Sequence, residues 1–371
     1  MRQLHALPVF FLAAACSTTF VDPDVGPGEA EREHELKVDG LPGGALHRMK
    51  AHLAGGTMPH DVLMQEFERQ QALLSIDTGP SVQWNWLGPA NAGGRIRAVL
   101  ISPVNPSRIW IGSAGGGVWR SDDAGATWQP MNNLLTALSI GSMALDPADV
   151  NHLYAGTGEG FFDAAEGTSN SAFLRGAGIF ESFDAGGTWT RIASTATPDF
   201  YFINRIVISP QSTATLLIAT NTGIFRSVNS GATWTQVHNQ RTFDVDFHPT
   251  DGTRAVAGRS DGTAVYSLDG GVSWTTATIP TTGSRIEVTY ARSNPLQVYA
   301  SITNAAGNAI TIWRSDNGGV SYALRTSGAG HPTLSDYLTS LWVDPTNSNN
   351  LVFGGQQCWR STGRCSGWQV A

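Results

Sequence analysis

Three carboxylates and Arg175 lie within one stretch of the chain, residues 156–178. The carboxylates are Glu159, Asp163 and Glu166. Two carboxyl groups held at a fixed separation can act as the acid and the base that cleave a glycosidic bond. The same residues also suit an ordinary polar loop, in which charges are solvated and acids cap turns. We therefore treat the three as candidates for catalysis, with a structural role as the alternative.

A second set of candidates suits the recognition of an anion. Guanidinium groups bind carboxylates through paired hydrogen bonds. Arg95 follows two glycines at the entry to an apolar run, although it can equally anchor a backbone carbonyl. The predicted ligand-binding residues are Asn91, Arg95, Arg97, Arg175, Arg205 and Tyr337.

Metal and phosphate chemistry find no support in the spacing of residues. His152, His238, His248 and His331 lie singly in different parts of the chain, without the spacing of a metal site. The glycine-rich stretch 112–117 lies between two strand-like runs, whereas a phosphate-binding loop precedes a helix. We therefore expect no metal and no cofactor.

A repeated turn motif must position these candidates. The pattern Ser-x-Asp-x-Gly-x-Thr-Trp, with variations, begins at Ser121, Ser182, Ser227, Ser267, Ser315 and Ser361. The starts are separated by 61, 45, 40, 48 and 46 residues, a period typical of a four-stranded propeller blade. We therefore predict an all-β propeller of about six to seven four-stranded blades. Either a strand at residues 83–87 completes the sixth blade and closes the ring, or the chain is truncated, and incomplete closure is left open.

The residue types in this motif favour a folding role. Short Ser and Asp side chains can hydrogen-bond the backbone of their own turn. The glycine permits a backbone conformation that side chains oppose, and the closing tryptophan buries a large area. A device repeated in every blade cannot be one active site. The predicted structural residues are Asp123, Asp184, Asn229, Asp269, Asn317, Trp128, Trp189, Trp234 and Trp274.

Propeller geometry then separates the two sets of residues. The repeated turn joins the third strand of a blade to the fourth. The loops after the second and fourth strands reach the opposite face, where the channel opens. We therefore expect the candidate carboxylates and arginines on the channel face and the repeated turns on the other.

The repeats resemble the BNR or Asp-box superfamily of propellers. This superfamily includes sialidases, xyloglucanase-type glycoside hydrolases, sortilin-like receptor domains and photosystem assembly propellers. Residues 86–131 are similar to the first blade of bacterial sortilin/xyloglucanase-like exported proteins. The resemblance implies a propeller fold, and either glycan hydrolysis or recognition. Ala114 stands where xyloglucanase-type enzymes have an acidic residue, and Arg95-Ile96-Arg97 partly matches the Arg-Ile-Pro motif of sialidases.

The beginning of the chain has the features of an export signal. In residues 1–16, Arg2 precedes an apolar run and small residues before Cys16, which resembles a bacterial lipobox. We expect lipidation of Cys16, with ordinary cleavage and secretion as the alternative. We predict a flexible linker over residues 17–43, a short helical segment over 44–80 and the Asp-box propeller over 81–371.

The two remaining cysteines, Cys358 and Cys365, flank a predicted turn. In an oxidising compartment we expect them to form a disulfide. The alternative is a pair of free thiols in an unfinished last blade.

The formal net charge of −7 argues against nucleic acid or a bare anionic membrane as the main partner. We expect a monomer that meets the membrane only through its lipid anchor, at the bacterial cell envelope or surface. The sequence favours an exported propeller that binds a glycan or a protein through its loop face. A sialidase-like or xyloglucanase-like glycosidase is the first alternative, and a truncated, inactive relative is the second.

Overall fold

The computed structural model describes residues 95–131, 137–161, 174–279, 283–304, 309–326, 331–332, 339–354, 357–363, 365 and 368–370. All of them belong to one compact unit, Trp86–Ala371. The predicted export signal, linker and helical segment lie outside the described residues.

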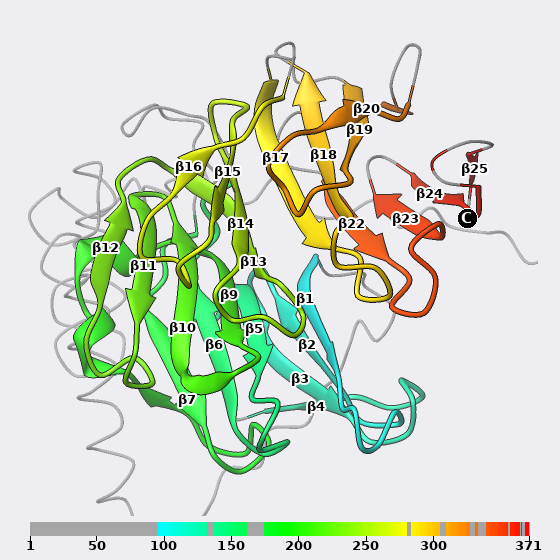
Figure 1. The fold of residues 1–371 in the computed structure, drawn as a ribbon. Helices are drawn as coiled ribbons and strands as arrows, with labels where there is room; N and C mark the ends of the chain where they lie inside the picture. Colours follow the sequence, from blue (N-terminus) through cyan, green and yellow to red (C-terminus); the bar gives the residue numbers. More distant parts are fainter. Residues whose placement is uncertain are drawn as a thin grey trace, which may run out of the picture. The chain divides into compact units, whose positions relative to one another are not determined.

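Six antiparallel sheets, here called blades I to VI in chain order, make up this unit (Figure 1). Blade I contains β1 (Ile96–Ile101), β2 (Ile109–Ser113), β3 (Gly117–Ser121) and β4 (Gln129–Pro130). Blade II contains β5 (Ile140–Leu145), β6 (Leu153–Thr157), β7 (Ile179–Ser182) and β8 (Thr190–Arg191). Blade III contains β9 (Ile203–Ser209), β10 (Ser212–Thr220), β11 (Gly223–Ser227) and β12 (Thr235–His238).

The second half of the chain repeats the arrangement. Blade IV contains β13 (Thr242–Phe247), β14 (Ala255–Arg259), β15 (Ala264–Ser267) and β16 (Thr275–Thr276). Blade V contains β17 (Gly283–Tyr290), β18 (Val298–Asn304), β19 (Ala309–Ser315) and β20 (Ala323–Leu324), and β21 (His331–Pro332) also pairs with β19. Blade VI contains β22 (Ser340–Val343), β23 (Leu351–Gly354), β24 (Cys358–Ser361) and β25 (Gln369–Val370).

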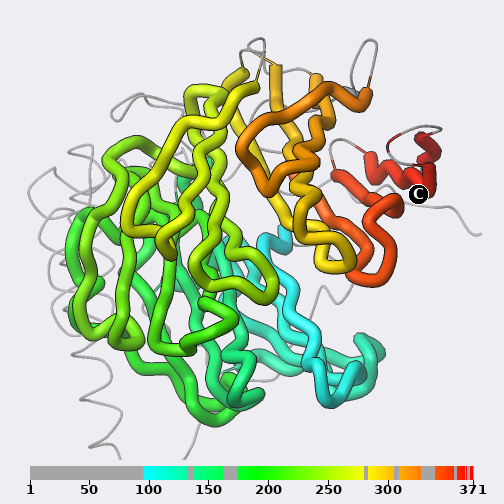
Figure 2. The backbone as a smooth tube through the Cα atoms, viewed as in Figure 1, coloured from blue at the N-terminus to red at the C-terminus, as the bar shows by residue number. Residues whose placement is uncertain are grey.

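The four strands of each blade pair in chain order, so every blade is a meander, as the path of the backbone in Figure 2 shows, and β21 is an additional strand beside β19. Two 3-10 turns, η1 (Ala193–Thr195) and η2 (Pro198–Phe200), are the helical elements of the described residues. The first strand of each blade lines a shared channel. The predicted all-β propeller of four-stranded blades is therefore confirmed, with six blades.

Apolar side chains pack between successive blades. Tyr154 and Ile179 of blade II meet Leu216 and Phe225 of blade III in one buried cluster. Strands of a blade that has a neighbouring blade on each side are covered on both faces. In blade IV, for example, every residue of β14 is buried. Burial of each such side chain contributes about 1.5–3 kcal/mol. The core therefore lies in the layers between blades, where it fixes the inner strands around the channel.

The repeated turns are closed by their own side chains. In blade II, the Ser182 hydroxyl accepts the Gly186 N–H at 2.8 Å and donates to Asp184 Oδ1 at 2.8 Å. Asp184 in turn accepts the N–H of Thr188 at 2.7 Å and its hydroxyl at 2.8 Å. The glycine has a φ of 91°, which a side chain would strain. The residue types of the motif therefore satisfy the geometry of one tight turn.

Asparagine closes the turn equally well in blade III. Asn229 Oδ1 accepts the Thr233 N–H at 2.9 Å, and its amide nitrogen donates to the Thr233 hydroxyl at 2.9 Å. The fourth residue of the motif also donates its N–H to the loop between the first two strands in blades I, II, IV and V, and to the start of the second strand in blade III. These donors are Ala124, Ala185, Ser230, Gly270 and Gly318. The repeated turns thus share a face with those loops. Trp128, Trp189, Trp234 and Trp274 are half-buried beside them.

The last copy of the turn departs from this pattern, and here the disulfide expectation is wrong. Cys365 occupies the position of the turn glycine and adopts a φ of 71°. Its side chain is buried in the cluster that holds Tyr299 and Phe353, whereas Cys358 on β24 is exposed. Because the two side chains enter different surroundings, both cysteines are free thiols.

Candidate functional site

One loop of blade II brings the candidate carboxylate Glu159 to the channel mouth. Gly158 donates its N–H to the Ser139 carbonyl at 2.8 Å, and Gly176 donates to the Tyr201 carbonyl at 2.9 Å. These partners stand just before the first strands of blades II and III. The loop after β6 therefore lies on the channel face, away from the repeated turns.

Glu159, in this loop, is fully buried between two arginines of blade I. Arg95 Nε donates to Glu159 Oε1 at 3.0 Å, and Arg97 Nε lies 3.5 Å from the same oxygen. The pair of contacts ties blade I to blade II at the channel. Asp163 and Glu166 lie outside the described residues, so a catalytic role for the three carboxylates stays a prediction.

Arginine and phenylalanine side chains alternate across the channel, and we call them the Arg–Phe stack. The Arg97 and Arg285 guanidinium carbons lie 3.8 and 4.3 Å from the centre of the Phe161 ring. Arg285 also lies 5.1 Å from the Phe243 ring, and Arg241 lies 4.8 Å from that ring. Cations this close to aromatic faces are attracted to the ring quadrupole. The stack therefore joins blades I, II, IV and V at the channel.

The stack holds positive charge in a confined space. Burial and the nearby Arg285 guanidinium lower the pKa of Arg97 to about 10. Glu159 and Glu287 act in the opposite direction. An anion entering here would lessen the repulsion between the guanidinium groups.

The channel contains a cavity of about 180 Å³, lined by the first strands of all six blades. Its charged lining residues are Arg97, Arg205, Arg285, Asp244 and Glu287. Ligand pockets for drug-sized molecules hold about 300–1,000 Å³. This cavity therefore has room for one small chemical group and not for a polymer strand.

Arg205 is the most open of these charged side chains. It sits within the ring of blades, yet 49% of its side-chain surface is exposed because it faces the channel. Its Nε lies 3.4 Å from Asp244 Oδ1. The neighbouring guanidinium groups of Arg97 and Arg285 are 11% and 2% exposed. A group that enters the cavity therefore meets Arg205 most readily.

Asp244 is bound to the walls of the channel. It accepts the N–H groups of Val245 at 3.0 Å and Val288 at 2.9 Å, the second from the next blade. Burial, and then the Glu287 carboxylate, hold the pKa of Asp244 well above its usual range, although Arg205 acts in the opposite direction. The cavity lining thus holds three guanidinium groups against two carboxyl groups, one of which resists ionisation.

The other predicted ligand-binding residues lie apart from this cavity or beyond the described part. Arg175 lies in the same loop as Glu159 and stacks on the Tyr201 ring at 3.6 Å. Asn91 and Tyr337 lie outside the described residues. Arg95, Arg97 and Arg205 are the predicted residues that the structure brings to the channel.

Six members of the site were missed by sequence reasoning: Phe161, Arg241, Phe243, Asp244, Arg285 and Glu287. One signal was present, since an arginine stands at or just before the first strand in blades I, III, IV and V. Aligning the repeats on these strands would have placed Arg241 and Arg285 at the channel. Phe161 has no such signal, because it lies in a loop of blade II that the other blades lack.

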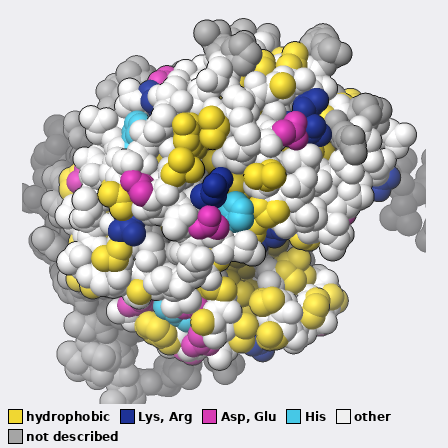
Figure 3. Space-filling view, in the orientation of Figure 1, with side chains coloured by type: hydrophobic (Ala, Val, Ile, Leu, Met, Phe, Trp, Pro, Cys, Tyr) yellow, Lys and Arg dark blue, Asp and Glu magenta, His cyan; other side chains and the backbone are white. Residues whose placement is uncertain are grey.

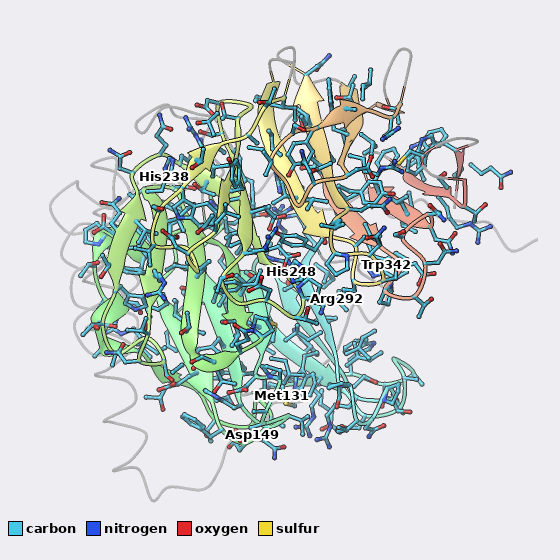
Figure 4. The ribbon with its side chains drawn as sticks, viewed as in Figure 1. Met131, Asp149, His238, His248, Arg292 and Trp342 are labelled. Carbon is cyan, nitrogen blue, oxygen red and sulfur yellow. The ribbon has the colours of Figure 1, made fainter. Side chains whose placement is uncertain are left out.

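The described residues contain no group of three His, Cys, Asp or Glu side chains able to hold a metal ion. His238 and His248 lie well apart, as Figure 4 shows. Among the same residues, no helix is long and apolar enough to cross a bilayer.

Comparisons with known proteins indicate the fold more than the activity. No family model matches the chain. A xyloglucanase from Paenibacillus sp is 24% identical over 176 residues, which is 40% of this chain and 16% of the relative. The xyloglucanase Xgh74A from Acetivibrio thermocellus is 26% identical over 176 residues, 40% of this chain and 19% of the relative. The chain thus spans less than a fifth of these relatives.

Solved structures show the same architecture. An ancestral GH74 enzyme superposes with a TM-score of 0.60 at 18% identity, covering 78% of this chain and 40% of that one. YCF48 from Cyanidioschyzon merolae gives a TM-score of 0.51 at 14% identity, covering 76% and 86%. At such identities the likeness extends to the propeller fold alone.

Proposed function

We propose that this chain is an exported recognition propeller that binds an acidic glycan, with one carboxylate of the glycan in the channel. The observation that carries the proposal is the half-open Arg205 guanidinium in a cavity with more guanidinium than carboxyl groups. Guanidinium groups hold carboxylates by charge-assisted hydrogen bonds. The xyloglucanase relatives support a glycan as the ligand.

The size of the cavity decides how such a ligand would bind. About 180 Å³ admits a single acidic group, so the rest of the glycan would lie across the loops of the channel face. Tyr201, with Arg175 stacked on it, lies among those loops and offers an aromatic surface for a sugar ring. The proposal therefore predicts recognition of a terminal or branching acidic sugar.

A screen of matched glycan pairs tests this function. Each pair contains an acidic oligosaccharide and the same oligosaccharide with its carboxyl groups reduced to alcohols. We expect binding of acidic members and at least tenfold weaker binding of reduced members, since a hydrogen bond to a charged group contributes about 1.5–3 kcal/mol. Equal binding of both members would contradict the proposal. Binding only to an acidic peptide included in the screen would replace the glycan by a protein partner.

A glycosidase is the second candidate, because two carboxyl groups from neighbouring blades line one cavity. Asp244 has the raised pKa of a general acid, and Glu287 stands beside it on β17. The contacts of Asp244 with Val245 and Val288 favour a structural role instead. Reducing ends released in the screen, and lost in Glu287→Gln, would establish the enzyme.

Export and anchoring remain part of the proposal and rest on residues 1–16. Lipidation of Cys16 would place the propeller at the surface of the cell envelope. Metabolic labelling with a fatty acid tests this point. We expect a labelled, membrane-bound protein and an unlabelled Cys16→Ser variant, whereas an unlabelled natural chain would contradict the anchor.

A further inference from the structure

The first strand of each of blades I to V contains a β-bulge, and the bulges supply part of the channel wall. On β9, Ile203 and Arg205 pair with successive residues of β10, so Asn204 between them is an extra residue. The bulges of the other four blades contain Arg97, Gly141, Phe243 and Arg285. A bulge changes the direction of a side chain. Asn204 and these four residues all line the cavity.

The side-chain amide of Asn204 is held in one orientation. Its Nδ2 donates to the Thr242 carbonyl at 2.8 Å and to Asn221 Oδ1 at 3.1 Å. Asn221 Oδ1 also accepts a hydrogen bond from Arg241 Nε at 3.4 Å, which fixes the orientation of Asn221 in turn. A reversed Asn204 amide would place its oxygen against two acceptors. The nitrogen of Asn204 is therefore fully used by the protein.

The oxygen of the same amide has no donor. Asn204 is 4% exposed, and no described residue donates a hydrogen bond to its Oδ1. Across the channel, the buried Thr339 hydroxyl of blade VI also lines the cavity without a partner in the described part of the chain. A buried acceptor without a donor destabilises the folded state. A ligand that supplies an O–H group to Asn204 would remove this cost.

A carboxylate alone cannot satisfy Asn204. An ionised carboxylate accepts hydrogen bonds and donates none, so one that binds Arg205 leaves Asn204 Oδ1 without a donor. Asn204 and Arg205 are adjacent in the chain, with Cα atoms about 3.8 Å apart, and both line the cavity. They can therefore contact neighbouring groups of one ligand. The cavity suits a ligand with a hydroxyl close beside its carboxylate.

The outer surface of the blades is less suited to such a ligand. Figure 3 shows basic and acidic side chains there in small groups of mixed sign. In blade I, for example, Arg108 and Arg120 both contact the exposed carboxylate of Asp122. Exposed pairs of this kind are screened by salt and attract a further anion weakly. The channel is the better place for an acidic sugar.

The structure of acidic sugars gives the hydroxyl a position. In a uronic acid, the carbon that bears the carboxylate also bears the ring oxygen, which cannot donate, so the nearest donor is the 4-hydroxyl. We propose that the channel selects a terminal uronic acid, with its carboxylate on Arg205 and its free 4-hydroxyl donating to Asn204 Oδ1. This inference rests on the proposed function and narrows its ligand. A chain of 4-linked uronic acids would be bound only at its non-reducing end, because its internal units lack that hydroxyl.

Titration calorimetry of the full chain with four methyl glycosides tests the inference. The probes are both anomers of methyl glucuronoside, of methyl galacturonoside, of their common 4-deoxy analogue and of uncharged methyl glucoside. We expect one of the two 4-hydroxy acids to bind about tenfold more tightly than the 4-deoxy analogue, because only the former supplies the donor. Equal affinity for the acids with and without the 4-hydroxyl would overturn the inference and leave the proposed function intact. Acids that bind no better than methyl glucoside would overturn both.

Two variants identify the residue that recognises the hydroxyl. Asn204→Ala should bind the 4-hydroxy and 4-deoxy acids equally and still prefer both to methyl glucoside, which shows that its channel is intact. The control Asn151→Ala changes an exposed asparagine between β5 and β6 and should keep both preferences. A preference for the 4-hydroxyl that survives Asn204→Ala would overturn the inference. Loss of both preferences together in Asn204→Ala would give Asn204 a structural role only and would also overturn it.

Discussion

Carboxylates on the repeated turns and carboxylates in the channel have opposite environments. Asp269, on a turn of blade IV, receives hydrogen bonds from the hydroxyl and N–H of Ser273, which lower its pKa to about 2. Asp244, in the same blade, is buried beside Glu287, and its pKa lies well above the usual range. Aspartate thus stabilises a solvent-exposed turn in blade IV, whereas in the channel of the same blade it is a buried carboxyl group beside a second one.

This difference distinguishes the residues of the repeated turns, which serve folding, from the residues of the channel, which form one site. The turn uses the same hydrogen bonds in five blades, and Asn replaces Asp in two of them without loss of the bonds. The channel residues differ from blade to blade, because each contributes one part to a single site. Repetition of the turn motif within the chain therefore identifies the scaffold, whereas the site is assembled from different residues that the first strands of several blades bring to the channel.

The largest effect should follow from breaking the channel. Glu159→Ala leaves Arg95 and Arg97 without their shared buried carboxylate, at a cost of about 3–5 kcal/mol in the free energy of unfolding. Urea denaturation measures this loss. The control is Asp122→Ala, which removes the exposed partner of Arg108 and Arg120 and should cost no more than about 1 kcal/mol. Similar losses of unfolding free energy in both variants would contradict the distinction between the buried channel and the exposed turns.

A smaller effect should follow from opening one turn. Ser182→Ala removes a buried hydroxyl that bonds both Gly186 and Asp184, so we expect a loss of about 1–2 kcal/mol in the same assay. Asp184→Asn should be nearly neutral at pH 7, because Asn229 closes the turn of blade III. A large loss in Asp184→Asn would show that the charge, and not the hydrogen bonds, holds the turn.

The two regions should also respond to pH with opposite sign. The folded pKa of Asp269, about 2, lies below its unfolded value of about 3.9, so its contribution is present above about pH 4 and is lost as the pH falls towards 2. Asp244 binds its proton more tightly in the folded state, so ionisation weakens folding as the pH rises above about 4.

Thermal melts of two variants resolve these signs. Relative to the unmodified chain, Asp269→Asn should gain stability as the pH falls from 4 to 2. Asp244→Asn should gain as the pH rises from 4 to 7. We expect differences in Tm of about 2–4 °C. Parallel pH profiles for the two variants would contradict the comparison.

The smallest expected effect concerns the last blade. It is a difference between the reaction rates of two thiols and does not involve the stability of the fold. Cys358 is exposed, whereas burial raises the pKa of the Cys365 thiol to about 12. A thiol reagent should therefore modify Cys358 quickly and Cys365 only on unfolding. Mass spectrometry of tryptic peptides measures the two rates. Equal rates in the folded chain would place Cys365 outside the core.

Sequence reasoning predicted the scaffold well because its signals are local. Each turn needs Ser, Asp and Gly within a few residues, and its period is visible by inspection. The channel depends on contacts between distant blades, such as Phe161 with Arg285, which no local pattern specifies. The disulfide prediction failed for a related reason, since it judged spacing without knowing that Cys365 turns into the core.

Three of the predicted anion-binding residues, Arg95, Arg97 and Arg205, lie at the channel because first strands must line the axis of a propeller. The residues that contact these arginines could be identified only from the structure. Glu159 was predicted as a catalytic candidate, yet its burial between Arg95 and Arg97 could not be foreseen from the polar loop that contains it.

Isothermal titration of an acidic oligosaccharide tests the central claim, that the channel binds a carboxylate through Arg205. The variants are Arg205→Gln and the control Arg254→Gln, whose arginine is 42% exposed beside Asp251 at the loop between β13 and β14. We predict that Arg205→Gln weakens binding at least tenfold while Arg254→Gln binds as the unmodified chain does. Unchanged affinity in Arg205→Gln, or equal losses in both variants, would contradict the account.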